Sequence, residues 1–286
     1  MNSIVEVPFV SKQDVMRNLS TVSEIFDATK AGELQPIDPS PTIQMVHSYT
    51  AEYFGDERAN KIITKAKDTP CFLGFLDNGN DAQMSLRLTA TDGKIQAYNC
   101  IIIDKRRVTA AEPPCFVSGF AHEAGHNANA KIFASEDNLE IMFIKAGCSL
   151  TKVASGIPVY ELGRGPEEGI LTDFQIYVFD RFCQDMKIPA FGLTLSNQAD
   201  VMENIRLMKK HNRKLFDELV DMQFEDDFAK FIEKRMALGA EACVNGKYER
   251  NGAIRDFFQA CKSSLQLPPG DKRNKELFKN FDYKNM

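Results

Sequence analysis

Apolar residues in the first part of the chain recur at helical spacing. Residues 12–29 carry valine, leucine, isoleucine and phenylalanine at intervals of three or four, which predicts an amphipathic helix. A second helix is predicted after the proline-rich stretch 32–41, with Ser40 as its N-cap and Pro41 in its first turn. His47 lies in this second helix, and we interpret it as a structural or surface histidine.

The spacing changes to a period of two after position 70. The segment MSLRLTA, residues 84–90, alternates apolar and polar side chains, and IQAYNCIII, residues 95–103, follows it. The turn signal TDGK separates the two segments, so the sequence predicts a β-hairpin.

A proline pair, Pro113 and Pro114, interrupts the chain after this hairpin. The next apolar pattern predicts a helix over residues 119–133, with Ser118 as a suitable N-cap.

The second half of the chain is predicted to be mainly helical. Residues 147–166 contain several glycines and prolines and are interpreted as a loop. Helical patterns cover residues 137–147, 167–186 and about 197–222, 225–238, 250–264 and 272–281. The predicted fold class is α+β, with a mixed α/β lobe over residues 1–134 that contains a small sheet, and a mainly helical lobe over residues 135–286.

Composition restricts the function classes. The chain is 43% hydrophobic and 26% charged, which is typical of a soluble globular protein. The net charge of −5 argues against general nucleic-acid binding. The N-terminal segment lacks the basic and apolar regions of a secretory signal, and no apolar run reaches the roughly 18 residues of a membrane span. Seven scattered cysteines indicate a reducing compartment, either the cytoplasm or a host cytosol that receives a bacterial effector without a cleavable signal peptide.

The segment GFAHEAGHNAN, residues 119–129, holds two of the four histidines. On a helix His122 and His126 lie one turn apart on one face, so both imidazoles can bind one metal ion. Glu123 projects to one side of this face, where it can take a proton from water instead of binding the metal. The alternative is an ordinary helix that carries two incidental histidines.

This His-Glu-x-x-His spacing resembles the signature of the zincin metallopeptidases. The resemblance implies one zinc ion per chain, Glu123 as the general base, and an active-site helix between an α/β lobe and a helical lobe. A third protein ligand is also needed. The metzincin extension is absent, because Asn129 and Ile132 stand where that group has glycine and histidine.

The segment GPEEGILTDF, residues 165–174, resembles the second motif of the gluzincin group, in which a later helix supplies a glutamate ligand. Aligning the two motifs places this ligand at Glu168, with Glu167 as the alternative. Glu167 replaces the usual asparagine, and Asp173 follows the ligand by five positions instead of four. The resemblance is therefore to a divergent gluzincin-like branch.

Further roles are assigned by the same resemblance. Asp173 and Thr172 are candidates to accept the second N–H of a ligand histidine. The strand over residues 94–104 resembles the edge strand that binds extended substrate in zincins, and the alternative is an ordinary internal strand. A thiolate ligand, Cys100 or Cys115, would instead resemble peptide deformylase. Candidate donors to the oxyanion are Tyr160, Tyr177, His211 and Tyr248.

These residues together predict a zinc-dependent endopeptidase that hydrolyses a protein or peptide substrate, either as a housekeeping enzyme or as a bacterial effector or toxin protease. The aminopeptidase motif of the type Gly-x-Met-Glu-Asn is absent upstream of the histidines, which favours an endopeptidase. One alternative is a zinc amidohydrolase, deacylase-like or deformylase-like, that acts on small substrates. Another is a non-catalytic helical binding protein.

Overall fold

The fold is α+β, as predicted, with helices and two small sheets. The computed structural model describes residues 4–18, 34–76, 80–91, 94–107, 113–135, 141–154, 157–162, 164–189 and, with gaps, 202–237. The chain divides into two units: unit 1 is Met1–Leu139 with Phe174–Leu193, and unit 2 is Glu140–Asp173 with Thr194–Met286. The lobes predicted for residues 1–134 and 135–286, as parts of a single catalytic domain, stay a prediction.

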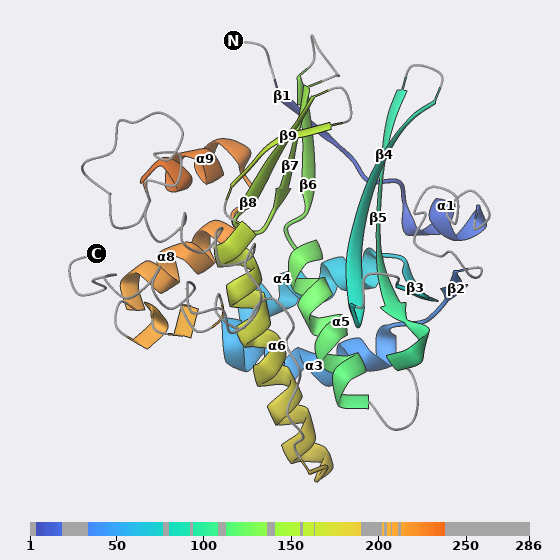
Figure 1. Ribbon diagram of the computed structural model, residues 1–286, viewed down its shortest axis with the longest axis vertical. Helices are drawn as coiled ribbons and strands as arrows, with labels where there is room; N and C mark the ends of the chain where they lie inside the picture. The colour runs from blue at the N-terminus through green and yellow to red at the C-terminus, as the bar shows by residue number, and fades with distance from the viewer. Residues whose placement is uncertain are drawn as a thin grey trace, which may run out of the picture. The chain divides into compact units, whose positions relative to one another are not determined.

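Unit 1 contains helices and most of the described strands (Figure 1). Its elements up to residue 135 are β1 (Ile4–Val7), α1 (Lys12–Arg17), β2 (Gln35–Pro36), α3 (Ser40–Phe54), α4 (Asp56–Asp68), β3 (Cys71–Gly74), β4 (Ala82–Thr91), β5 (Lys94–Asp104), the 3-10 turn η1 (Lys105–Arg107), α5 (Pro113–Asn127) and β6 (Lys131–Ser135). Helix α3 starts as predicted, except that Pro39 takes the N-cap position and Ser40 is the first helical residue. Of the helix predicted over residues 12–29, α1 confirms the first part, and the rest lies outside the described residues.

A four-stranded sheet in the order β2-β3-β5-β4 forms the framework of unit 1. Strands β4 and β5 form the predicted antiparallel hairpin, with Ala82 opposite Ile103. Strand β3 pairs in parallel with the other side of β5, with Cys71 opposite Ile101. Strand β5 is therefore interior, and the prediction that residues 94–104 form an edge strand is wrong. The edge strand of this hairpin is β4.

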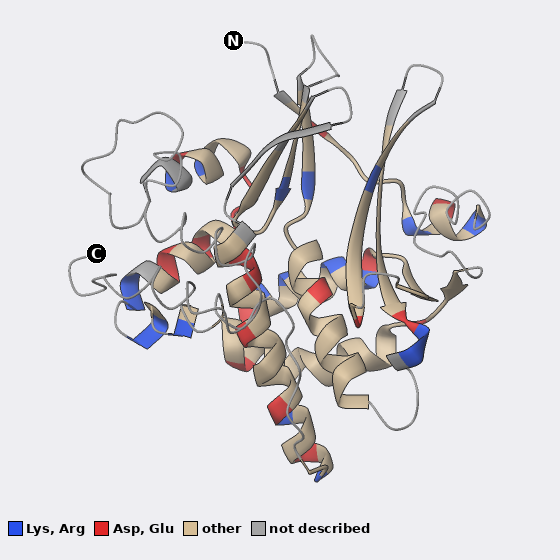
Figure 2. Ribbon diagram, viewed as in Figure 1, with Lys and Arg blue, Asp and Glu red and all other residues tan. Residues whose placement is uncertain are grey.

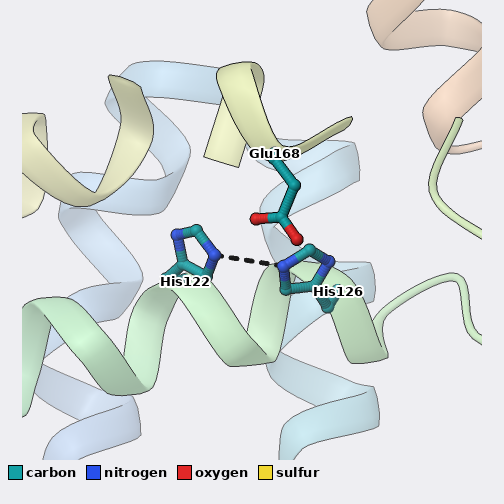
Figure 3. A group of neighbouring side chains, drawn as sticks. All are labelled: His122, His126 and Glu168. Atoms are coloured by element: carbon teal, nitrogen blue, oxygen red, sulfur yellow. Dashed lines mark hydrogen bonds between the residues drawn. The ribbon is translucent and has the colours of Figure 1, made fainter. Parts of the chain in front are cut away.

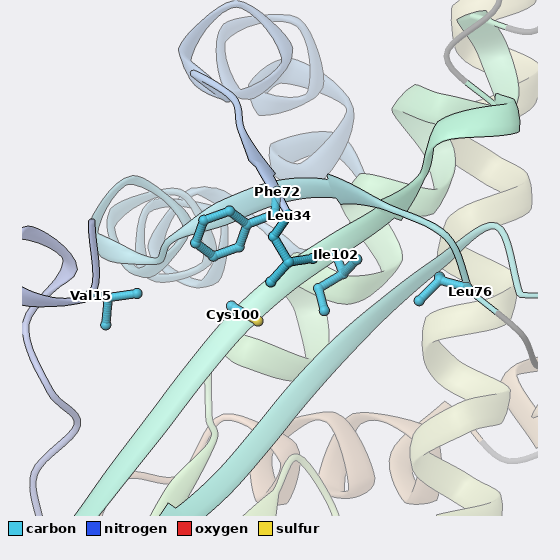
Figure 4. Packing of buried hydrophobic residues seen from close by; sticks show 6 residues of the cluster. All are labelled: Val15, Leu34, Phe72, Leu76, Cys100 and Ile102. Carbon is cyan, nitrogen blue, oxygen red and sulfur yellow. The ribbon is translucent and has the colours of Figure 1, made fainter. Parts of the chain in front are cut away.

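One face of this sheet covers an apolar cluster (Figure 4). Cys100 and Ile102 of β5 point into it with Phe72 of β3 and, from outside these two strands, Val15, Leu34 and Leu76. Burial raises the pKa of the Cys100 thiol well above its ordinary value, so this cysteine acts as a small hydrophobe.

Helix α5 packs on strands β4 and β5 and on helix α4. It begins at Pro113, which suits a first helical turn because proline lacks the N–H that such a turn leaves unpaired. The predicted N-cap, Ser118, is wrong: it is buried inside the helix, and its hydroxyl donates to the Cys115 carbonyl. The helix ends at Asn127, and the last residues of the predicted helix belong instead to β6, which pairs antiparallel with β1.

Unit 2 begins with strands where the sequence predicted a helix and a loop. Strands β7 (Ile141–Ala146), β8 (Ser149–Ala154) and β9 (Ile157–Leu162) form an antiparallel meander. The predicted helix over residues 137–147 and the predicted loop over residues 147–166 are therefore wrong over these strands. The second half of the chain, predicted to be mainly helical, therefore also contains a β-meander.

Helix α6 (Arg164–Met186) confirms the helix predicted over residues 167–186. Its residues up to Asp173 belong to unit 2 and the rest to unit 1, where the Phe174 ring contacts the rings of Tyr53 and Phe54. Helices α8 (Arg213–Gln223) and α9 (Phe228–Ala237) follow in unit 2, within the predicted helical patterns. The helices predicted over residues 250–264 and 272–281 lie outside the described residues. None of the described helices combines the length and apolar character needed to cross a bilayer.

Candidate metal centre

The two histidines of the motif lie side by side on helix α5 (Figure 3). His122 is 5% exposed and His126 is 9% exposed. Their Nε2 atoms are 3.0 Å apart, and the ring planes meet at 66°. Two nitrogen ligands of a tetrahedral zinc ion are separated by about 3.4 Å, as follows from zinc–nitrogen bonds of about 2.0–2.1 Å. The imidazoles therefore already have nearly the spacing that joint coordination requires.

Glu168, in the first turns of helix α6, points its carboxylate toward the two imidazoles (Figure 3). One ligand atom from each of His122, His126 and Glu168 lies within 4.8 Å of the other two, and all three residues are buried. Within the described part of the chain, this is the group of histidine, cysteine and acidic side chains that could hold a metal ion.

The donor chemistry of this group fits zinc. Two imidazole nitrogens and one carboxylate oxygen form a known catalytic zinc ligand set, which leaves one coordination position open. Burial of a carboxylate is costly unless a charge or hydrogen bonds compensate, and a divalent cation supplies that charge. Helix α5 contributes little charge of its own, because Glu123 is its one acidic residue and it has no lysine or arginine (Figure 2).

Glu123 lies beside the first histidine but outside the metal-binding group. Its side chain is half-buried, and its Oε2 accepts a hydrogen bond of 2.6 Å from the backbone N–H of Met84 on strand β4. The carboxylate is therefore held at the edge of the sheet, one residue from a candidate ligand.

The neighbouring acid, Glu167, is placed differently from Glu168. It is 2% exposed and packs against Gly147 in the turn between β7 and β8. A Cβ atom at position 147 would lie 3.1 Å from the Cγ and Oε1 atoms of Glu167. Glu167 and Glu168 were the alternatives for the third metal ligand, and the structure groups Glu168 with the histidines.

The two candidates for a supporting role follow Glu168 on helix α6. Thr172 is fully buried one turn later. Asp173, which is also buried, forms ion pairs with Arg206 at 2.6 Å and with Lys209 at 3.5 Å. Sequence reasoning missed both cations. Lys209 belongs to the basic run KKHNRK, residues 209–214.

Helix α6 carries Tyr177 away from the metal-binding group. Nine residues separate it from Glu168, and at about 100° per residue this places the two side chains on opposite faces of the helix. The Tyr177 hydroxyl donates to the Glu52 carboxylate at 2.6 Å. Burial and this hydrogen bond raise the pKa of Tyr177.

Of the remaining oxyanion candidates, Tyr160 belongs to strand β9, and His211 and Tyr248 lie outside the described residues.

The other histidine and cysteine candidates lie apart from the metal-binding group. His47 is exposed, as expected for a surface histidine, and its Nε2 atom lies 3.3 Å from Oδ1 of Asn60. Neither Cys100 nor Cys115 belongs to the metal-binding group. Cys115 packs with Phe179 and Cys183.

A buried polar network that sequence reasoning missed fixes the end of helix α5. The Asn99 amide donates to the Asn127 side chain at 2.7 Å, and the Asn127 amide donates to the Thr69 hydroxyl at 2.6 Å. All three residues are buried, and Asn127 directly follows His126. The available signal was Asn99 itself, because it shares its strand face with Ala97 and Ile101, which are apolar.

No family model matches this chain, no curated protein matches it, and no solved structure matches it. The site is therefore interpreted from its own residues and geometry.

Proposed function

We propose that this protein is a zinc-dependent endopeptidase that hydrolyses peptide bonds in a protein or peptide substrate, with one zinc ion held by His122, His126 and Glu168. The juxtaposition of these three ligand atoms, within 4.8 Å of one another, carries the proposal. The position of Glu123, one residue along the same helix and outside the group, supports it.

A zinc ion in this group would supply Lewis acidity and would lower the pKa of a water molecule in its open position to about 7. Glu123 then takes the proton from the attacking water and passes it to the leaving nitrogen. Its Oε2 accepts the Met84 hydrogen bond, and the carboxylate has further lone pairs, on Oε1 and on Oε2 itself, for this proton.

Strand β4 supports an extended peptide as the substrate. It is the edge of its sheet among the described strands, and α5 packs against it. An exposed strand edge can bind an extended chain through backbone hydrogen bonds, with side chains on alternate positions giving specificity. The described cysteines are all free, which supports the proposal that the protein works in a reducing compartment.

The deciding experiment compares wild type with Glu123→Gln. Both proteins should bind about one zinc ion, because Glu123 lies outside the ligand group, and the variant should lose turnover by a factor of about 10² to 10⁴ since it cannot accept a proton. Zinc is measured by elemental analysis, and cleavage is measured by identifying new N-termini in a cell lysate. The control is Glu57→Gln, on the exposed first turn of helix α4.

Three outcomes separate the alternatives. Equal cleavage by wild type and Glu123→Gln would contradict the role of the general base. Turnover of small acylated compounds without any cleaved protein would replace the endopeptidase with an amidohydrolase. A wild-type chain that binds no zinc would leave a non-catalytic binding protein.

A further inference from the structure

The hydrogen bond between strand β4 and Glu123 connects the edge of the sheet with the proposed general base. The Met84 nitrogen lies 2.6 Å from Glu123 Oε2, well within hydrogen-bond distance. Backbone donors are rigid, so a carboxylate held in this way has a fixed position relative to the strand.

The Met84 N–H is available for this contact because of its register in the hairpin. Met84 lies opposite Ile101, and Leu86 lies opposite Asn99. In an antiparallel pair, backbone groups of alternate residues point toward the partner strand and away from it. Since the Met84 N–H points to Glu123 and away from β5, the N–H of Leu86 also points away from β5.

We infer that the backbone N–H of Met84 is a positioning group for the proposed reaction: it holds the Glu123 carboxylate in place, and it therefore leaves Leu86 as the next residue of β4 after Met84 that offers its outward N–H to an extended peptide. This role rests on the proposed function. It assigns different tasks to two successive outward-facing amides of one strand.

A contact at Leu86 supports these different roles for the Met84 and Leu86 amides. The Leu86 carbonyl accepts a hydrogen bond of 3.0 Å from the guanidinium of Arg87, whose side chain is exposed. An exposed side chain on a strand edge protects that edge from unwanted pairing, and it can move away when a peptide binds. The contact to Met84 differs, because its acceptor is a half-buried side chain of a packed helix.

Hydrogen exchange tests the contact without any need for turnover. In the zinc-loaded wild type the Met84 amide should exchange slowly and the Leu86 amide fast. In Glu123→Ala the Met84 amide should exchange about 10- to 100-fold faster, which corresponds to the loss of one hydrogen bond to a charged group. A fast Met84 amide in the wild type, or one that does not change in the variant, would overturn the inference.

Proline substitution tests the role, because proline removes one N–H and is tolerated on edge strands. Met84→Pro should lower kcat about 10- to 100-fold with little change in KM, since the base is misplaced. Leu86→Pro, the matched control, should mainly raise KM. Both are assayed on one internally quenched peptide chosen from a library, after circular dichroism and zinc content confirm folding.

The results separate the two proposals. An unchanged kcat in Met84→Pro, or the same loss in both proline variants, would overturn the positioning role. A wild-type protein that cleaves no peptide would contradict the proposed function, whereas the exchange rate of the Met84 amide would still decide whether the contact exists.

Discussion

At the scale of single residues, Gly147 packs against Glu167, the acid that directly precedes the proposed ligand Glu168 on helix α6. Its φ of +53° is the left-handed conformation that favours glycine, and a Cβ atom there would meet Glu167 at 3.1 Å and the Cγ atom of Gln223 at 3.2 Å. Gly147→Ala should therefore cost about 1–3 kcal/mol of unfolding free energy and weaken zinc binding, because a displaced Glu167 moves the adjacent Glu168.

The matched control for this substitution is Gly55→Ala. Gly55 also has a positive φ, of 86°, but a Cβ atom there would meet no atom within 4 Å. This variant should lose stability and keep its zinc affinity. Urea unfolding and zinc titration of both variants provide the measurement. Equal zinc affinity in Gly147→Ala and wild type would show that Glu167 does not determine the position of Glu168.

Of the three proposed metal ligands, the sequence predicts the two histidines but does not select the acid. His122 and His126 could be predicted because a spacing of four residues on a helix already defines one face. Glu167 and Glu168 could not be distinguished in the same way, because the two acids are adjacent and their surroundings come from other segments: Glu167 packs against Gly147, and Glu168 is grouped with the histidines. Asp173 was assigned to a histidine, although its structural partners are Arg206 and Lys209.

At the scale of elements, a hydrogen bond connects helices α3 and α6. The Tyr49 hydroxyl donates to the Asp185 carboxylate at 2.7 Å, and burial, together with this bond, raises the pKa of Tyr49 to about 12. Because the folded state keeps the proton more tightly than the unfolded state, the stabilisation is complete below about pH 10 and is lost as the pH rises toward 12.

Unfolding experiments between pH 9 and 12 test this link. The free energy of unfolding should fall with pH by up to about 2 kcal/mol more in wild type than in Tyr49→Phe, which has no hydroxyl to ionise. Parallel curves for the two proteins would show that Tyr49 ionises alike in the folded and unfolded states.

Helices and strands whose apolar residues recur at one regular spacing could be predicted, and strands in which this spacing is interrupted could not. The hairpin β4–β5 and the helix α6 follow one period along their length. Strand β7 contains Lys145, which is fully buried with its Nζ atom over the Phe231 ring. A charged side chain normally indicates an exposed position, so the sequence pattern did not identify this strand. In the meander, a register shift between Lys152 and Val153 breaks the alternation, and Pro158 lies within β9, so the segment looked like a loop.

At the scale of the whole molecule, the sequence does not predict features that depend on contacts between segments far apart in the chain. The parallel pairing of β3 with β5 makes β5 an interior strand, and no local pattern records which strand joins from the far side. The α+β class could be predicted from the order of the elements. The zincin-like architecture stays a proposal that depends on the resemblance of two short motifs.

Zinc binding should affect the stability of the whole chain, because the proposed ligands come from two helices far apart in the sequence. An ion that binds only the folded state adds about 4 kcal/mol at a free concentration 1,000 times its Kd, so a chelator should lower the Tm and excess zinc should restore it. Glu168→Gln should remove most of this difference, and Glu167→Gln, which changes the neighbouring acid outside the ligand group, should retain it. Melting curves measured with chelator and with zinc test both variants. If Glu167→Gln abolishes the zinc-dependent shift and Glu168→Gln preserves it, the third ligand is the other acid. If the wild type melts at the same temperature with and without zinc, the three side chains do not form a metal site.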